Sequence, residues 1–174
     1  MNRSAAFRAA VAGIIGAAGG GLLVRVFPAL ELGLFANGAA RIAGLFTGTP
    51  VVRVEQGWAL PAASSPVVVT AACSATSFFV MVTAIIAWQL ARRGRSVAFA
   101  VFAGLIAAAP VAIFINSLRI VTVAQVHRWV IPLLPGTCEP FLHLATGIAV
   151  FLPSLIALNL LLEYNGYRHI PSNR

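Results

Sequence analysis

Long apolar runs, separated by short polar or basic segments, make up most of the chain. The runs over residues 74–91 and 141–162 would extend about 27 Å and about 33 Å as helices, at 1.5 Å per residue. Helices of this length cross the hydrocarbon core of a bilayer, which is roughly 30 Å thick. Residues 9–24 and 96–115 have the same character, and Pro110 predicts a kink. We therefore expect an all-α integral membrane protein with about four transmembrane helices.

The segment of residues 28–47 interrupts this pattern, because Glu31, Asn37 and Arg41 lie among its apolar residues. The spacing of its larger apolar residues places them on one face of a helix; these residues are Leu30, Leu34, Ile42 and Leu45. This pattern favours a helix that lies at the membrane interface or is partly inserted. A fifth full span is the second interpretation, because it would force one arginine cluster to the outside.

Residues 49–72 differ in composition from the apolar runs. Residues 51–55 and 67–70 are β-branched, and a stretch rich in Gly, Pro and Ser separates them. β-Branched runs bounded by turn residues are typical of short strands. We predict a short extracytoplasmic loop resembling a β-hairpin, ahead of the first cysteine, with Arg53 and Glu55 facing water.

The charge of the chain supports a membrane environment. Hydrophobic residues account for 60% of the chain and charged residues for 9%, whereas soluble domains carry about 25% charged residues. The net charge is +8, and every basic residue other than histidine is an arginine. Because the arginines lie mainly at the ends of apolar runs, they indicate anchoring in membrane lipid and not a nucleic-acid partner.

Three arginine clusters predict the orientation of the spans: Arg3 with Arg8; Arg92 with Arg93 and Arg95; and Arg168 with Arg174. Cytoplasmic segments carry the excess of basic residues, so both termini are expected inside a multi-pass protein of the cell (plasma) membrane. The chain is one integral membrane domain, 1–174. We expect residues 1–48 to form an N-terminal helix and an interfacial segment, residues 49–72 an extracytoplasmic loop, and residues 73–174 a helical core that contains the candidate site described next.

Three reactive side chains fall near the extracytoplasmic boundary in this topology. Cys73 immediately precedes the helix of residues 74–91, and a helix N-terminus favours the nucleophilic thiolate. Arg119 lies past the outer end of the rising span, which residues 116–129 continue as a possible helix, and its guanidinium suits an oxyanion. His143, in the first turn of the last span, can transfer protons. Together they suit acyl transfer through a thioester.

Further residues near this set are candidates for substrate binding or support: Ser74, Asn116, His127 and Glu139. His127 shares a helix face with Asn116 and Arg119, which makes it a rival base. Glu139 precedes His143 by four residues and is placed to orient it. The sequence has no metal-ligand spacing and no phosphate-binding loop, so we expect neither a metal nor another cofactor.

Three short motifs carry a resemblance to a known family. Ala72-Cys73-Ser74, the Asn116-x-x-Arg119-Ile120 segment and the segment from His143 to Gly147 resemble the Cys, N-x-x-R-I and His motifs of the exosortase/archaeosortase family of membrane transpeptidases. The resemblance covers about residues 67–162. It departs at Ala75, where the family usually has Gly. The resemblance implies that Cys73 is the nucleophile, Arg119 the transition-state stabiliser and His143 the acid/base.

The resemblance also implies a substrate class. Such enzymes act on secreted proteins that carry a C-terminal signal made of a short motif, a transmembrane helix and a basic tail. The enzyme cuts near the motif, holds the protein as a thioester on the cysteine and passes it to an acceptor. The site would lie on the extracytoplasmic side.

The residues alone leave two other classes open. The first is a structural or assembly membrane protein in which Cys73 and Cys138 form a disulfide and Arg119 is an interfacial anchor. The second is a small transporter with Asn116 and Arg119 lining a polar path. The second has less support, because the predicted spans carry no ionisable residue at mid-membrane.

Overall fold

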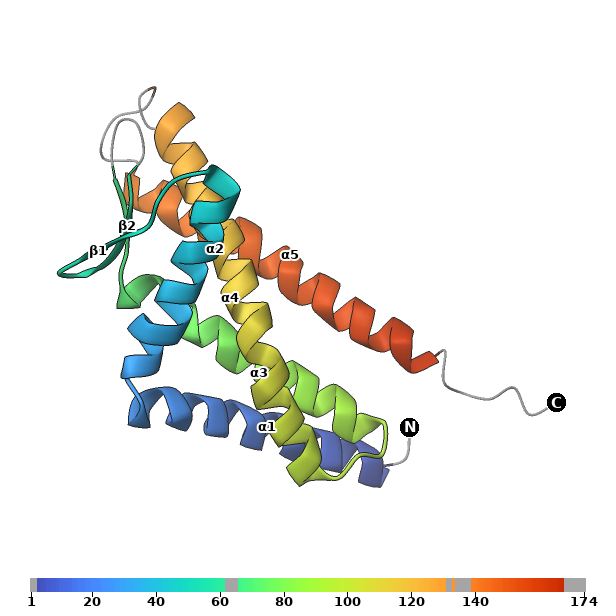
Figure 1. The fold of residues 1–174 in the computed structure, drawn as a ribbon. Coiled ribbons are helices and arrows are strands. Elements are labelled where there is room, and N and C mark those ends of the chain that lie inside the picture. The colour runs from blue at the N-terminus through green and yellow to red at the C-terminus, as the bar shows by residue number, and fades with distance from the viewer. Residues whose placement is uncertain (1–2, 62–65, 131–132, 134–138, 168–174) are drawn as a thin grey trace.

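We describe the protein from a computed structural model, for residues 3–61, 66–130, 133 and 139–167. Four helices form most of this part of the chain (Figure 1), namely α1 (Arg3–Val26), α3 (Thr76–Arg92), α4 (Val97–Trp129) and α5 (Glu139–Tyr167). Among the described residues, α1, α4 and α5 are long and apolar enough to cross a membrane, while α3 is apolar but has only 17 residues. The prediction of a mainly helical fold is confirmed, and three of its helices are long and apolar enough to cross a membrane.

The helix α4 is continuous over 33 residues, with Pro110 inside it. At 1.5 Å per residue it is about 50 Å long, which exceeds the roughly 30 Å of a bilayer core. The predicted helical continuation over residues 116–129 is confirmed. Arg119 therefore lies within α4 and not beyond its end, so its backbone is held rigidly.

Small residues hold α1 against α3. Ala9, Ala12, Gly16 and Gly20 are the buried residues of α1, and a Cβ added to Gly16 would lie 3.1 Å from the Cβ of Ala87. Small side chains let helix backbones approach closely in a membrane, where packing takes over from the hydrophobic effect. The larger core lies beside this contact and contains Phe35, Phe78, Phe79, Val82, Ile86, Ala108 and Ala112.

Two polar contacts join the C-terminal end of α3 to α5. The amide of Gln89 donates a hydrogen bond of 2.8 Å to Asn159 Oδ1, and Arg92 lies 3.6 Å from the carboxylate of Glu163. Gln89 is buried, so its partner satisfies a polar group that lipid would leave unpaired. These contacts fix α3 and α5 together at the ends that lie away from Cys73.

Residues 31–47 form a π-helix, η1 (Glu31–Ala36), that runs into α2 (Asn37–Thr47). Leu34 and Leu45 of the predicted apolar face are exposed, as contact with lipid at an interface requires, and the buried residues are Phe35, Ala36, Ala39, Ala40, Ala43 and Gly44. These alanines pack with Ile120 of α4, since small side chains permit a close approach. With 11 residues, α2 is shorter than a membrane span.

A three-stranded antiparallel sheet precedes the cysteine, in the order β1 (Val52–Val54), β2 (Gly57–Leu60) and β3 (Val67–Val69). The predicted hairpin-like loop is present, with Arg53 and Glu55 exposed, but the central strand β2 lies in the stretch interpreted as a turn. Gly57, at φ 151°, is required there because an added Cβ would collide with the carbonyl oxygen of Val69. The strand β3 leads directly to the turn that carries Cys73.

We predict the orientation of this fold from its arginine clusters. Reporter fusions after Arg95 and after Arg174 should give a cytoplasmic signal, because basic segments stay inside. A fusion near Pro61, in the loop of the sheet, should give an extracytoplasmic signal. A cytoplasmic signal near Pro61 would contradict the orientation and place the sheet and Cys73 on the inner side.

Candidate active site

Cys73 is the last residue of a short 3-10 turn between β3 and α3, η2 (Ala71–Cys73). Its backbone N–H donates a hydrogen bond of 2.9 Å to the carbonyl of Thr70. The helix α3 begins only at Thr76, so the prediction that Cys73 immediately precedes it needs correction. Two residues stand between the thiol and the helix, and the partial positive charge of the helix end acts on Cys73 less directly than predicted.

Arg119 and His143 form a hydrogen-bonded pair between α4 and α5. Arg119 Nη2 lies 2.9 Å from His143 Nε2. A guanidinium has donors only, so Nε2 is the acceptor, and the imidazole in this arrangement is neutral with its proton on Nδ1. His143 lies one turn inside α5 and not in its first turn, because α5 begins at Glu139.

The three predicted catalytic residues surround one small cavity. Cys73, Arg119 and His143 line a space of about 30 Å³, together with residues of β3 and of α4. A volume of this size accepts a water molecule or a single carbonyl oxygen. Residues from three separate segments thus come together around a space where one reacting oxygen fits.

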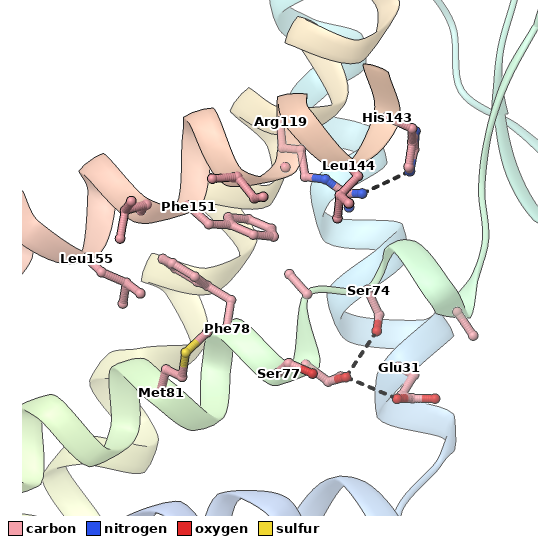
Figure 2. A pocket seen from close by; sticks show the side chains of 16 residues that line it. Glu31, Ser74, Ser77, Phe78, Met81, Arg119, His143, Leu144, Phe151 and Leu155 are labelled. Atoms are coloured by element: carbon pink, nitrogen blue, oxygen red, sulfur yellow. Dashed lines mark hydrogen bonds between the residues drawn. The ribbon is translucent and has the colours of Figure 1, made fainter. Parts of the chain in front are cut away.

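A second, much larger cavity of about 830 Å³ also has Arg119 and His143 in its lining (Figure 2). Arg119 and His143 line both cavities. The larger one lies between α3 and α5, and its apolar wall consists mainly of Phe78, Met81, Leu144, Ile148, Phe151, Leu152 and Leu155. Its size is within the range of cavities that bind small molecules or a few peptide residues.

Residues of α5 pack closely against the guanidinium of Arg119. A Cβ added to Gly147 would lie 3.3 Å from Arg119 Nε, and the Phe151 ring centre lies 5.4 Å from Arg119 Cζ. Gly147 therefore leaves the room that the guanidinium occupies. Arg119 Nε is buried and has no hydrogen-bond partner among the described residues, so this donor is available to an acceptor that binds beside it.

Asn116 connects α4 to the cysteine turn. It is fully buried, and its side-chain amide donates a hydrogen bond of 2.6 Å to the carbonyl oxygen of Cys73. Arg119 follows three residues later on the same helix, so both side chains project from one face. The predicted supporting role of Asn116 is thus matched by a direct contact with the cysteine backbone.

The other predicted supporting residues differ in their positions. Ser74 is buried and lines the large cavity. His127 is partly buried on α4, two turns past Arg119, and lines neither of the two cavities. Glu139 opens α5, and its side chain lies outside the described part of the structure. His143 is therefore better placed than His127 to act on Cys73.

Glu31 is a residue of this region that the sequence did not single out. It lines the large cavity, and its Oε1 accepts a hydrogen bond of 3.2 Å from the Thr76 hydroxyl. The only signal in the sequence was an acidic residue within an apolar segment. Its position follows from how η1 packs beside the start of α3, which local sequence does not specify.

The described residues contain no group of three or more His, Cys, Asp or Glu side chains that could hold a metal ion. Cys73 has a free thiol. Cys138, the partner in the alternative disulfide, lies outside the described residues.

No family model, no curated protein and no solved structure matches this chain.

Ala75, between Cys73 and α3, has a left-handed backbone with φ 57° and ψ 26°. It is the only residue other than glycine with a positive φ among those described, and this conformation costs an alanine about 1 kcal/mol. Ala75→Gly should relieve that strain, offset in part by the greater freedom of glycine in the unfolded chain. We predict a net gain of about 0.5 kcal/mol, or about 1–2 °C in thermal midpoint.

The matched control is Ala71→Gly, in the same turn but without a positive φ. Thermal unfolding of both purified variants is the measurement, and Ala71→Gly should lower the midpoint because glycine disfavours ordered backbone. A similar decrease in both variants would contradict the strain at Ala75.

Proposed function

We propose that this protein is a membrane-embedded cysteine transpeptidase of the exosortase/archaeosortase type, which cleaves the C-terminal sorting signals of secreted proteins through a thioester. The observation that carries the proposal is the common cavity of Cys73, Arg119 and His143, to which three segments far apart in the sequence contribute. A nucleophile, a proton carrier and a fixed cation are the groups that acyl transfer needs.

In the first half of the reaction, His143 takes the proton of the Cys73 thiol, and the sulfur attacks the carbonyl carbon of the scissile peptide. As the C–S bond forms, the carbonyl electrons move to oxygen. The free donor of Arg119 then stabilises this oxyanion. Collapse breaks the C–N bond, the leaving amine takes the proton from His143, and a thioester remains on Cys73.

The Arg119–His143 contact allows His143 Nε2 to accept a hydrogen bond from the guanidinium at rest and the thiol proton during the reaction. While the guanidinium donates to Nε2, the lone pair of the imidazole is occupied. When the carbonyl oxygen of a bound substrate attracts the guanidinium, that lone pair becomes available for the thiol proton before the sulfur attacks. In the second half, an acceptor gives its proton to His143 and attacks the thioester, the C–S bond breaks, and the thiolate recovers a proton.

The proposal includes four spans, with α3 as the fourth. Its 17 residues extend about 26 Å as a helix, and the Gln89–Asn159 contact satisfies a buried polar group within it. With the arginine clusters inside, Cys73 and the large cavity lie on the extracytoplasmic side of the plasma membrane. The apolar wall between α3 and α5 then lies at a depth where a secreted protein's membrane anchor begins.

The two cysteine substitutions test the proposal directly. Cys73→Ser keeps nearly the same volume but replaces the thiol with a hydroxyl, which is much harder to ionise. We expect this variant to reach the membrane in normal amounts and to leave anchored precursor proteins uncut. Cys138→Ser should remain active. The measurement is the ratio of anchored to released secreted proteins in cells, together with the abundance of each variant in the membrane.

The disulfide alternative gives a different result in the same experiment. Removing either partner breaks the same crosslink, so both variants should lose about 2–4 kcal/mol of stability and fall in abundance together. Equal losses in Cys73→Ser and Cys138→Ser would contradict the proposed nucleophile.

Arg119→Lys tests the role of the guanidinium. Lysine keeps the charge but lacks the Nε donor and the planar fork. Loss of one such donor typically costs about 3–4 kcal/mol in the transition state, so we predict a fall in cleavage of several hundredfold at normal abundance. The matched control is Arg128→Lys, at an exposed position near the end of α4, which should be active. Near-normal cleavage by Arg119→Lys would indicate that Arg119 only anchors the helix.

A further inference from the structure

The large cavity has a second polar wall, separate from the Arg119–His143 pair. Glu31 of η1, Ser74 of the turn that follows Cys73 and Thr76, the first residue of α3, form this wall, and Figure 2 shows Glu31 and Ser74 in it. The Ser74 hydroxyl lies 3.4 Å from Thr76 Oγ1, and Thr76 Oγ1 lies 3.2 Å from Glu31 Oε1. Ser74 thus donates to Thr76, and Thr76 donates to Glu31, so two hydroxyl oxygens and one carboxylate oxygen are grouped between an apolar wall and the turn of Cys73.

Within the described part of the chain, the carboxylate of Glu31 has no ion-pair partner, since the ion pair found there joins Arg92 to Glu163. Glu31 is partly buried, and placing an anionic group in a mostly apolar cavity is costly unless a cation accompanies it. The Thr76 hydroxyl offsets only a part of this cost. The guanidinium of Arg119 also lines this cavity but forms no ion pair with Glu31 among the described residues. The cavity therefore has an anionic side at Glu31, and that side favours a cationic group.

The backbone on both sides of this wall departs from regular geometry. Glu31 begins a π-helix of six residues, and Ala75, between Ser74 and Thr76, has a positive φ. π-Helical turns and strained residues are found preferentially at functional sites, because regular helices hold their side chains in fewer directions. Both departures aim oxygen atoms into the same cavity.

We propose that Glu31, with Ser74 and Thr76, binds the cationic nitrogen of a ligand in the large cavity. An ammonium group has three donors, which match the three grouped oxygens, and its carbon chain lies along Phe78 and Met81. The cation comes from an amine acceptor or from a basic side chain of the protein being cleaved. Both of these sources presuppose the proposed function, whereas the binding of a cation at Glu31 does not.

The acceptor role involves a defined transfer of atoms. The bound ammonium gives one proton to His143, and the neutral nitrogen attacks the thioester carbonyl carbon. The C–N bond forms and the C–S bond breaks. The nitrogen gives its second proton to the Cys73 thiolate, and His143 releases the first proton to solvent. The product is an amide, and no oxidant or reductant is needed.

Calorimetric titration of the purified full-length chain with n-butylammonium tests the binding site, and n-butanol serves as the neutral ligand of similar size. We expect saturable binding of n-butylammonium that is weakened about tenfold or more in Glu31→Gln, which can still accept the Thr76 hydrogen bond. The matched control is Glu55→Gln, at an exposed position of the sheet loop, which should bind like the original chain. Cys73→Ser should also bind normally, so this readout is independent of catalysis.

Equal binding of n-butylammonium by the original chain and by Glu31→Gln would overturn the proposal. If Glu31→Gln fails to fold, the original chain alone decides the question. A preference for n-butylammonium over n-butanol supports the anionic site, and the absence of that preference rejects it.

The amount of thioester on Cys73 in cells separates the two sources of the cation. If the acceptor supplies it, Glu31→Gln should accumulate thioester, because the adduct forms but is not passed on. If the cleaved protein supplies it, Glu31→Gln should contain less thioester than the original chain. Absence of any thioester in the original chain would contradict the proposed function and leave the calorimetric result to decide the cation site.

Discussion

The hydrogen bond from Asn116 to the carbonyl oxygen of Cys73 is the contact on which the arrangement of the site depends. It measures 2.6 Å, and Asn116 is fully buried. Breaking such a bond leaves a buried donor and a buried acceptor without partners, at a cost of about 1–3 kcal/mol each. The bond holds the turn of Cys73 against α4, and Arg119 extends from the same face of that helix to His143 on α5. One buried amide thus sets the position of the thiol relative to the guanidinium.

Several features near Cys73 cost stability and are not required by the fold. Ala75 has a left-handed backbone, and Arg119 Nε and Asn116 Oδ1 are buried with no hydrogen-bond partner in the part of the chain that the structure describes. Elsewhere the chain satisfies buried polar groups, as in the Gln89–Asn159 contact. Unmet polar groups and strained backbone that gather at one place are expected where a protein holds groups ready for a ligand. Arg119 lines both cavities and Ala75 the larger one, while Asn116 contacts the backbone of Cys73, and these positions are consistent with the proposed chemistry.

Much of the fold could be predicted from the sequence, because apolar runs and arginine clusters determine helices and their order in a membrane. The grouping of Cys73, Asn116, Arg119 and His143 followed from their similar depths in that order. Strand β2 could not be predicted, since its residues Gly57–Leu60 lie among turn-forming residues and pair only through contacts with both neighbours.

Tertiary packing, and not the local hydrophobic pattern, determined which residues of η1 and α2 are buried. In η1 and α2 the leucines satisfied the periodicity, yet Ala39 and Ala43 face α4 because they allow close contact between backbones. The same packing brings Glu31 to the large cavity. Contacts between side chains of separate segments depend on how those segments pack, and a short stretch of sequence does not determine that packing.

The most direct test of the account is mass spectrometry of the peptide that contains Cys73, taken from the intact protein in cells and handled without reducing agent. The account predicts a fraction of Cys73 joined through a thioester to the C-terminus of a secreted protein, with the bond cleaved by hydroxylamine. A Cys73 found only in a disulfide with Cys138 would contradict it, because a sulfur in a stable disulfide is not available as a nucleophile.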